Sequence, residues 1–101
     1  NFEEGRKLFE KVLNIDDKHI RAFKNYFLIT KVNSENQYFK KLEKLDLSDA
    51  SYEDKKFAYT SLSKCNFDLN NSDKALKYLE DLKNLKKSKS NFNIELEKKL
   101  F

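Results

Sequence analysis

The sequence predicts an all-α protein of about six helices, paired as antiparallel hairpins that stack on one another. Three observations lead to this prediction. The chain of 101 residues has no proline and a single glycine, so helices run without interruption and sheet turns lack their usual residues. Apolar residues recur at three- and four-residue steps, which is the helical period. Only short polar segments separate these stretches, and a helix with one apolar stripe needs a neighbour to cover it.

The first two predicted helices cover about residues 2–14 and 18–32. Asp16 and Asp17 begin the turn between them. Each helix carries one apolar stripe at helical spacing. The residues expected to face inward are Leu8, Phe9, Val12 and Leu13 in the first helix, and Ile20, Phe23, Tyr26, Phe27 and Thr30 in the second.

The next two helices are predicted over about residues 35–45 and 52–69. Ser34 is the expected N-cap of the earlier one, because Gln37 follows at the capping-box spacing that satisfies two backbone donors. Ser51 is the expected N-cap of the later one, with Asp54 in its first turn, where negative charge suits the helix dipole. The inward-facing residues are expected to be Tyr38, Phe39, Leu42 and Leu45, followed by Tyr59, Leu62, Cys65 and Leu69.

The last two helices are predicted over about residues 72–86 and 91–101, after a polar turn at residues 70–72. Their apolar stripes contain Ala75, Leu79 and Leu82, and then Phe92, Leu96 and Leu100. Part of the last stripe should pack back on the preceding helix. We therefore predict a single domain over residues 1–101, with hairpins at about 18–45 and 52–86 and flanking helices at about 2–14 and 91–101.

The segment from Phe57 to Leu85 resembles a tetratricopeptide repeat, and the region before it resembles a more diverged repeat with a preceding half-repeat. Gly5, Phe39 and Ala75 occupy the same place in successive hairpins, at intervals of 34 and 36 residues, and 34 is the period of this family. The resemblance implies a right-handed superhelix. It also implies small residues where two helices approach closely, which Gly5, Ser63 and Ala75 satisfy and from which Phe27 and Phe39 depart.

The same resemblance implies a concave groove lined by the first helix of each hairpin. The residues that fall on this face, at steps of three and four, are Arg21, Lys24, Leu28 and Lys31 in one helix, and Phe57, Thr60, Lys64 and Phe67 in the other. Four cations with apolar spots between them suit an acidic, partly hydrophobic peptide. Leu28 stands where the family's carboxylate-binding pattern has an amide. A solvated face without a ligand is the alternative.

A second resemblance concerns residues 75–101. This segment is similar to the junction in bacterial proteins where a tetratricopeptide array leads into a sulfotransferase domain. The residues that match the order at that junction are Asn84, Lys86, Lys87, Phe92 and Phe101, whereas Asn93 stands in place of a common acidic residue. The resemblance implies a catalytic domain for 3′-phosphoadenosine 5′-phosphosulfate beyond Phe101. The alternative function is therefore that of the helical arm of a sulfotransferase.

No catalytic, metal or cofactor site is predicted within the chain. His19 is the only histidine and lacks further nitrogen or sulfur ligands at metal-binding spacing, so a turn residue is expected. Cys65 lies on the inward stripe without a histidine to activate it, which favours a small core residue over a nucleophile. A single glycine cannot form a glycine-rich phosphate loop. What remains is a surface for a protein or peptide.

The charge pattern favours a protein partner over nucleic acid. The chain has 21 basic and 17 acidic residues, for a net charge of +4, and lysine and glutamate interleave as they do on solvated helix faces. The exception is a basic cluster after residue 82, which we assign to the end of a helix, with nucleic-acid binding as the alternative: Lys83, Lys86, Lys87 and Lys89. One cysteine and no membrane-length or signal-like apolar run predict a cytoplasmic protein.

Overall fold

The computed structural model describes the backbone of residues 2–100 and the side chains of residues 2–89. Within residues 2–100 it contains five helices and no strand, which confirms the all-α prediction with one helix fewer than expected. The helices are α1 (Phe2–Ile15), α2 (Ile20–Leu28), α3 (Gln37–Lys44), α4 (Tyr52–Asp68) and α5 (Ser72–Leu100).

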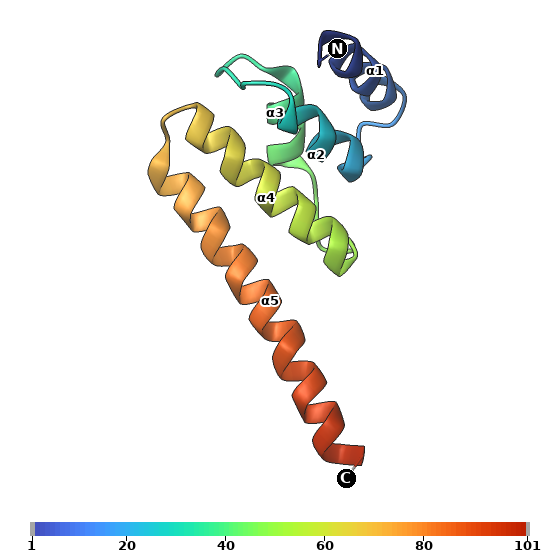
Figure 1. Ribbon diagram of the computed structural model, residues 1–101, viewed down its shortest axis with the longest axis vertical. Coiled ribbons are helices and arrows are strands. Elements are labelled where there is room, and N and C mark those ends of the chain that lie inside the picture. The colour runs from blue at the N-terminus through green and yellow to red at the C-terminus, as the bar shows by residue number, and fades with distance from the viewer. Residues whose placement is uncertain (1, 101) are drawn as a thin grey trace.

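Helix α4 is the centre of the fold. It packs against α2, α3 and α5, whereas α1 packs against α2 (Figure 1). Helix α5 turns back after α4, lies along it and continues past its other end, so the molecule measures 53 × 30 × 25 Å (Figure 1). Consecutive helices therefore pack together at α1–α2, α3–α4 and α4–α5, whereas α2 packs mainly on α4, and a superhelical repeat geometry stays a prediction.

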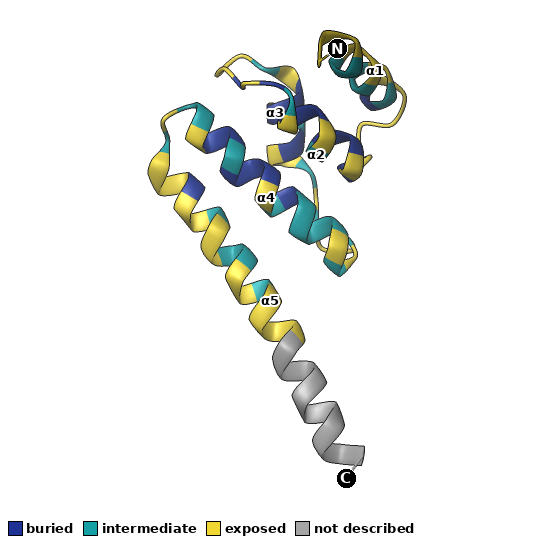
Figure 2. Cartoon of the chain, viewed as in Figure 1, coloured by how far each residue is buried: buried dark blue, intermediate teal, exposed yellow. Residues whose placement is uncertain are grey.

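The core lies between α2, α3 and α4, where the dark-blue residues of Figure 2 gather. Phe23 and Phe27 of α2 are stacked with ring centroids 6.2 Å apart and are essentially inaccessible to solvent. Tyr26 meets Tyr38 of α3 edge to face at 5.0 Å. Leu42 is also fully buried. Burying one such side chain contributes about 1.5–3 kcal/mol, so these aromatic contacts hold α2 and α3 together.

Three side chains begin helices by accepting bonds from backbone N–H groups. Ser51 Oγ accepts from the Asp54 N–H at 3.1 Å, as predicted. His19 Nδ1 accepts from the Ala22 N–H at 3.1 Å and so caps α2. The predicted cap at Ser34 is wrong. Asn36 caps α3 instead, because its Oδ1 accepts from two backbone N–H groups while its Nδ2 donates to the Tyr26 hydroxyl at 3.0 Å.

Helix α2 ends at Leu28, four residues before the predicted end, and α3 begins at Gln37. Side chains of α4 bind the backbone of the connecting segment. The Lys64 ammonium donates to the Thr30 carbonyl and also pairs with the Asp68 carboxylate. Asp68 Oδ2 accepts from the N–H of Val32, a residue only 3% exposed, at 3.1 Å. We call Lys64 and Asp68, with these two backbone groups, the loop clamp.

The turn between α4 and α5 follows from its sequence. Asn70 adopts a left-handed conformation with φ of 59°, which asparagine tolerates better than most residues. Its N–H donates to the Phe67 carbonyl at 3.0 Å, and the Asn71 N–H donates to the Asn66 carbonyl at 2.8 Å. These two bonds form a Schellman motif that satisfies carbonyls at the end of α4.

Of the three small residues expected where helices approach closely, two lie at such a contact. Ser63 and Ala75 are both buried, and Ser63 Oγ donates to the Ala75 carbonyl across the α4–α5 contact at 3.1 Å. At Gly5 of α1, an added Cβ would lie 3.4 Å from Ile29 Cδ1, an ordinary contact distance. A close approach is therefore needed at Ser63 and Ala75, whereas Gly5 has room for a methyl group.

Two inward-facing assignments and one helix boundary are corrected. Leu8 is 62% exposed and Leu79 is 40% exposed. The side of α5 that meets α4 carries Ala75 and Tyr78, and Ala75 is the one fully buried residue among the described side chains of α5. The two helices predicted after residue 70 form one continuous helix, α5. The predicted stripe of Phe92, Leu96 and Leu100 lies outside the described side chains.

Candidate functional site

The predicted groove face contains a cluster of cations around an aromatic ring. On α2, the Arg21 guanidinium carbon lies 6.0 Å and Lys24 Nζ 4.4 Å from the centroid of the Phe57 ring of α4. Lys56 Nζ approaches the same ring at 5.7 Å. Arg21, Lys24, Asn25 and Phe57 line an open hollow of about 210 Å³, which we call the cationic hollow.

A smaller apolar hollow of about 90 Å³ adjoins the cationic hollow along the seam between α2 and α4. The two hollows share Lys24, whose side chain lies between them. Leu28, at the end of α2, is 66% exposed at the edge of the apolar hollow. The full lining of the apolar hollow is Lys24, Phe27, Leu28, Thr60, Ser61 and Lys64. An apolar side chain of a ligand would therefore lie one helical turn from the cationic hollow.

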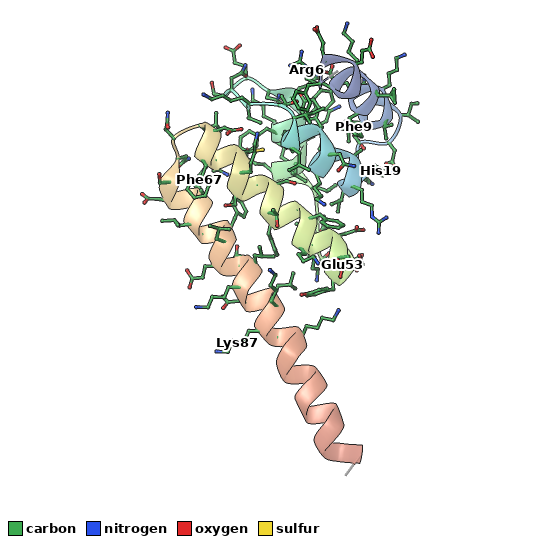
Figure 3. All side chains as sticks on the ribbon, in the orientation of Figure 1. Arg6, Phe9, His19, Glu53, Phe67 and Lys87 are labelled. Atoms are coloured by element: carbon green, nitrogen blue, oxygen red, sulfur yellow. The ribbon has the colours of Figure 1, made fainter. Side chains whose placement is uncertain are left out.

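Six of the eight residues predicted for the groove line these two hollows. They are Arg21, Lys24, Leu28, Phe57, Thr60 and Lys64. Lys31 follows the end of α2, so the helical spacing that placed it on this face does not apply. Phe67 is 46% exposed near the end of α4 opposite Glu53 (Figure 3). Contact between these residues and a ligand stays a prediction.

The cations of this face differ in what already binds them. Lys64 already binds Asp68 and the Thr30 carbonyl in the loop clamp, and Lys56 forms an ion pair with Glu53 at 2.9 Å. The hydrogen bond from Lys56 lowers the pKa of Glu53. Neither Arg21 nor Lys24 forms an ion pair within 4 Å with any carboxylate of residues 2–89. These two side chains are therefore placed to attract an anionic group, although the charge of Arg21 also contributes, after the hydrogen bond from Lys56, to lowering the pKa of Glu53.

Sequence reasoning missed Asn25 and Lys56 as members of this face. Asn25 lies four residues after Arg21 on α2, so helical spacing was the signal that could have identified it. Lys56 precedes Phe57 on α4 and reaches the ring by the length of its side chain. Asn25 adds an amide donor beside the two cations, which favours an anionic ligand further.

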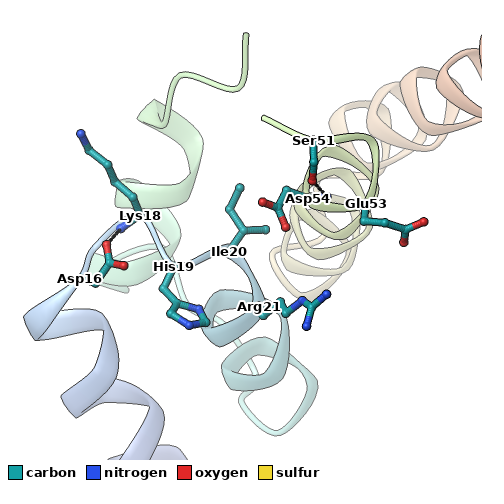
Figure 4. Close-up of a pocket in the computed structure, with 8 residues that line it drawn as sticks. All are labelled: Asp16, Lys18, His19, Ile20, Arg21, Ser51, Glu53 and Asp54. Carbon is teal, nitrogen blue, oxygen red and sulfur yellow. Dashed lines mark hydrogen bonds between the residues drawn. The ribbon is translucent and has the colours of Figure 1, made fainter. Parts of the chain in front are cut away.

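A wider hollow of about 510 Å³ lies between the α1–α2 turn and the start of α4 (Figure 4). Three of its polar side chains already have structural partners. Asp16 accepts from the Lys18 N–H at 3.1 Å, and His19 and Ser51 cap α2 and α4. Figure 4 shows the bonds made by Asp16 and Ser51. These bonds form the turn before α2 and the starts of α2 and α4. His19, which we expected to be a turn residue, has the more specific role of capping α2.

The Cys65 thiol is not placed to act as a nucleophile. Burial raises the pKa of Cys65 to about 12, which keeps this thiol protonated and unreactive near neutral pH. The thiol is buried in the core cluster. Within residues 2–89, no group of three or more histidine, cysteine, aspartate or glutamate residues is arranged to hold a metal ion.

Comparison with protein-family models, with curated proteins and with solved structures finds no match to this chain. The tetratricopeptide and sulfotransferase resemblances therefore stay predictions. Among the described helices, none combines enough length with enough apolar sequence to cross a lipid bilayer.

Proposed function

We propose that this chain is a protein-interaction module that binds an acidic, partly apolar peptide segment along the seam between α2 and α4. The observation that carries the proposal is the position of Arg21 and Lys24 over the Phe57 ring, without a carboxylate partner within 4 Å among residues 2–89. A carboxylate of the peptide would supply that partner and add charge-assisted hydrogen bonds.

The neighbouring apolar hollow supports a peptide over a simple anion. Leu28 is largely exposed beside it, and Thr60 and Phe27 form its walls. An aliphatic side chain of the peptide that enters this hollow removes its own apolar surface and that of Leu28 from water. Charge at the cationic hollow would then orient the peptide, and apolar contact would add affinity.

The test is a titration of the chain with a fluorescent peptide of alternating aspartate, glutamate and leucine, followed by anisotropy at several salt concentrations. Affinity should fall as salt rises, because exposed charges are screened. Lys24→Glu should weaken binding by about tenfold or more, since it replaces an attractive contact by a repulsive one. Leu28→Ser should also weaken binding, with the helical circular-dichroism signal unchanged.

Two matched variants control for general effects. Lys77→Glu makes the same charge change on the exposed part of α5, and Leu8→Ser removes a leucine of similar exposure from α1. Both should bind the peptide as the parent chain does. If Lys77→Glu weakens binding as much as Lys24→Glu, the peptide senses only net charge, and the seam between α2 and α4 is not the site.

A further inference from the structure

A separate hollow of about 390 Å³ lies on another part of the molecule, where α1, the α2–α3 connection and the start of α3 meet. Its lining contains Glu10 from α1 and Glu35 from the connection, and no lysine or arginine, although the chain has 21 basic residues. The proposed peptide seam is cationic, so this hollow has the opposite electrostatic character. We call it the acidic hollow.

The two carboxylates of the acidic hollow are weakly neutralised by the protein itself. Glu10 Oε1 lies 4.0 Å from Arg6 Nε, and the Arg6 guanidinium also lies 3.9 Å from Glu3. Exposed pairs at such distances contribute little. Glu35 forms no ion pair among residues 2–89; only its backbone N–H is engaged, by Asn33 Oδ1 at 3.0 Å.

The hydroxyl of Tyr26 is placed at this hollow to donate a hydrogen bond to a ligand. Tyr26 is 4% exposed and lines the hollow, and its oxygen accepts from Asn36 Nδ2 at 3.0 Å. No described group accepts the Tyr26 proton. Tyr38, equally buried, differs because its hydroxyl donates to Asn14 Oδ1 at 3.1 Å. An acceptor on a ligand in this hollow would therefore gain a hydrogen bond from Tyr26.

The ligand that fits must therefore supply both a cation and a hydrogen-bond acceptor. The side-chain amides of Asn33 and Gln37, which also line the hollow, can donate to or accept from such a ligand. Burial and the charge of Glu10 together raise the pKa of Tyr38, which is consistent with an electronegative hollow. An arginine residue within a peptide has this combination, since its guanidinium offers five N–H donors and its backbone offers a carbonyl.

We propose that the acidic hollow binds an arginine residue of an extended peptide, with the guanidinium between Glu10 and Glu35 and a peptide carbonyl accepting the Tyr26 proton. The proposal stands independently of the acidic peptide at the seam between α2 and α4, because the acidic hollow shares no residue with the cationic hollow or the apolar hollow. Together, the acidic hollow and the cationic seam could bind two oppositely charged segments of one partner.

The experiment compares three probes by amide chemical-shift titration of the whole chain: acetyl-Gly-Arg-Gly-amide, the same peptide with neutral citrulline, and butylguanidine, which has one positive charge and no carbonyl. The arginine peptide should shift the amides around Glu35 and Gln37 and bind about tenfold or more tightly than the citrulline peptide, because only arginine carries the charge. Butylguanidine should bind at the same place more weakly, since it has no carbonyl for Tyr26.

Variants locate the binding. Glu35→Gln should lower the affinity for the arginine peptide by about tenfold, whereas Glu43→Gln, an equal charge change on exposed α3, should leave it unchanged. Tyr26→Phe should reduce the affinity for the peptide to that for butylguanidine without changing butylguanidine binding, which also shows that the hollow is still formed. Equal affinity for the arginine and citrulline peptides, or an unchanged affinity of Glu35→Gln, would overturn the proposal.

Discussion

Replacing Asp68 by alanine should destabilise the protein by about 1–4 kcal/mol, although the residue lies at the end of a helix near the surface. The loop clamp gives this magnitude. Its removal leaves the N–H of buried Val32 without an acceptor, at a cost of about 1–3 kcal/mol. It also breaks the ion pair with Lys64, whose half-buried position makes it worth up to about 1 kcal/mol more. Asp68→Asn keeps an acceptor for Val32 and should cost about 1 kcal/mol.

Urea unfolding followed by circular dichroism measures these differences. Asp49→Ala, a substitution in the exposed α3–α4 connection, serves as the control and should change stability by no more than about 0.5 kcal/mol. Lys64→Met with Asp68→Ala should be less destabilising than the sum of the two single variants, because the partners share one interaction. If Asp68→Ala costs no more than Asp49→Ala, the clamp does not hold the α2–α3 connection, and the early end of α2 needs another cause.

Three further outcomes are expected. Leu42→Ala should lower the free energy of unfolding by about 2–5 kcal/mol, because Leu42 is 1% exposed. Leu79→Ala should lower it by less than about 1 kcal/mol, because Leu79 is 40% exposed. Thermal unfolding measures both, and equal losses would contradict this packing. Asn70→Val should cost about 1–2 kcal/mol and Asn70→Gly almost nothing, since φ at this residue is 59°, and calorimetry of both variants checks this. Cys65 should react with a thiol reagent only after unfolding. Its folded pKa of about 12, against an ordinary 9.0, contributes stability that is complete below pH 9.0 and is lost as pH rises toward 12, so a flat stability profile above pH 9.0 would argue against its burial.

The helical class and several helix ends were predictable because local chemistry determines them. Ser51 caps α4 as expected, and the asparagine turn before α5 forms the predicted break. The cap at Ser34 was not correct, because two residues close in sequence compete for that role. Asn36 prevails through a hydrogen bond to Tyr26 of another helix, which no local pattern reveals.

The end of α2 and the inner side of α5 depended on contacts between distant residues. Bonds from Lys64 to Thr30 and from Val32 to Asp68 span 34 and 36 positions, and they replace helical bonds that periodicity alone would continue. On α5, steps from Ala75 to either Tyr78 or Leu79 both fit a helix, and only the packing against α4 distinguishes them. The candidate site was predictable as a face of two helices. The bonds that Lys64 forms to Asp68 and to the Thr30 carbonyl were not predictable.

Ala75 is the one fully buried side chain among residues 72–89 of α5, and this has a consequence for how the protein opens. Separating α5 from α4 exposes Ala75 and the buried Ser63 of α4, but it leaves the aromatic residues of α2 and α3 packed, so this step should need less free energy than global unfolding. Native-state hydrogen exchange should then resolve two cooperative units, with α5 released while α2, α3 and α4 stay folded. Each release uncovers Tyr59 and Ser63 on α4, which Tyr78 and Ala75 otherwise contact. The equilibrium at this one helix contact therefore sets how often the interior of α4 becomes accessible to proteases and to other chains.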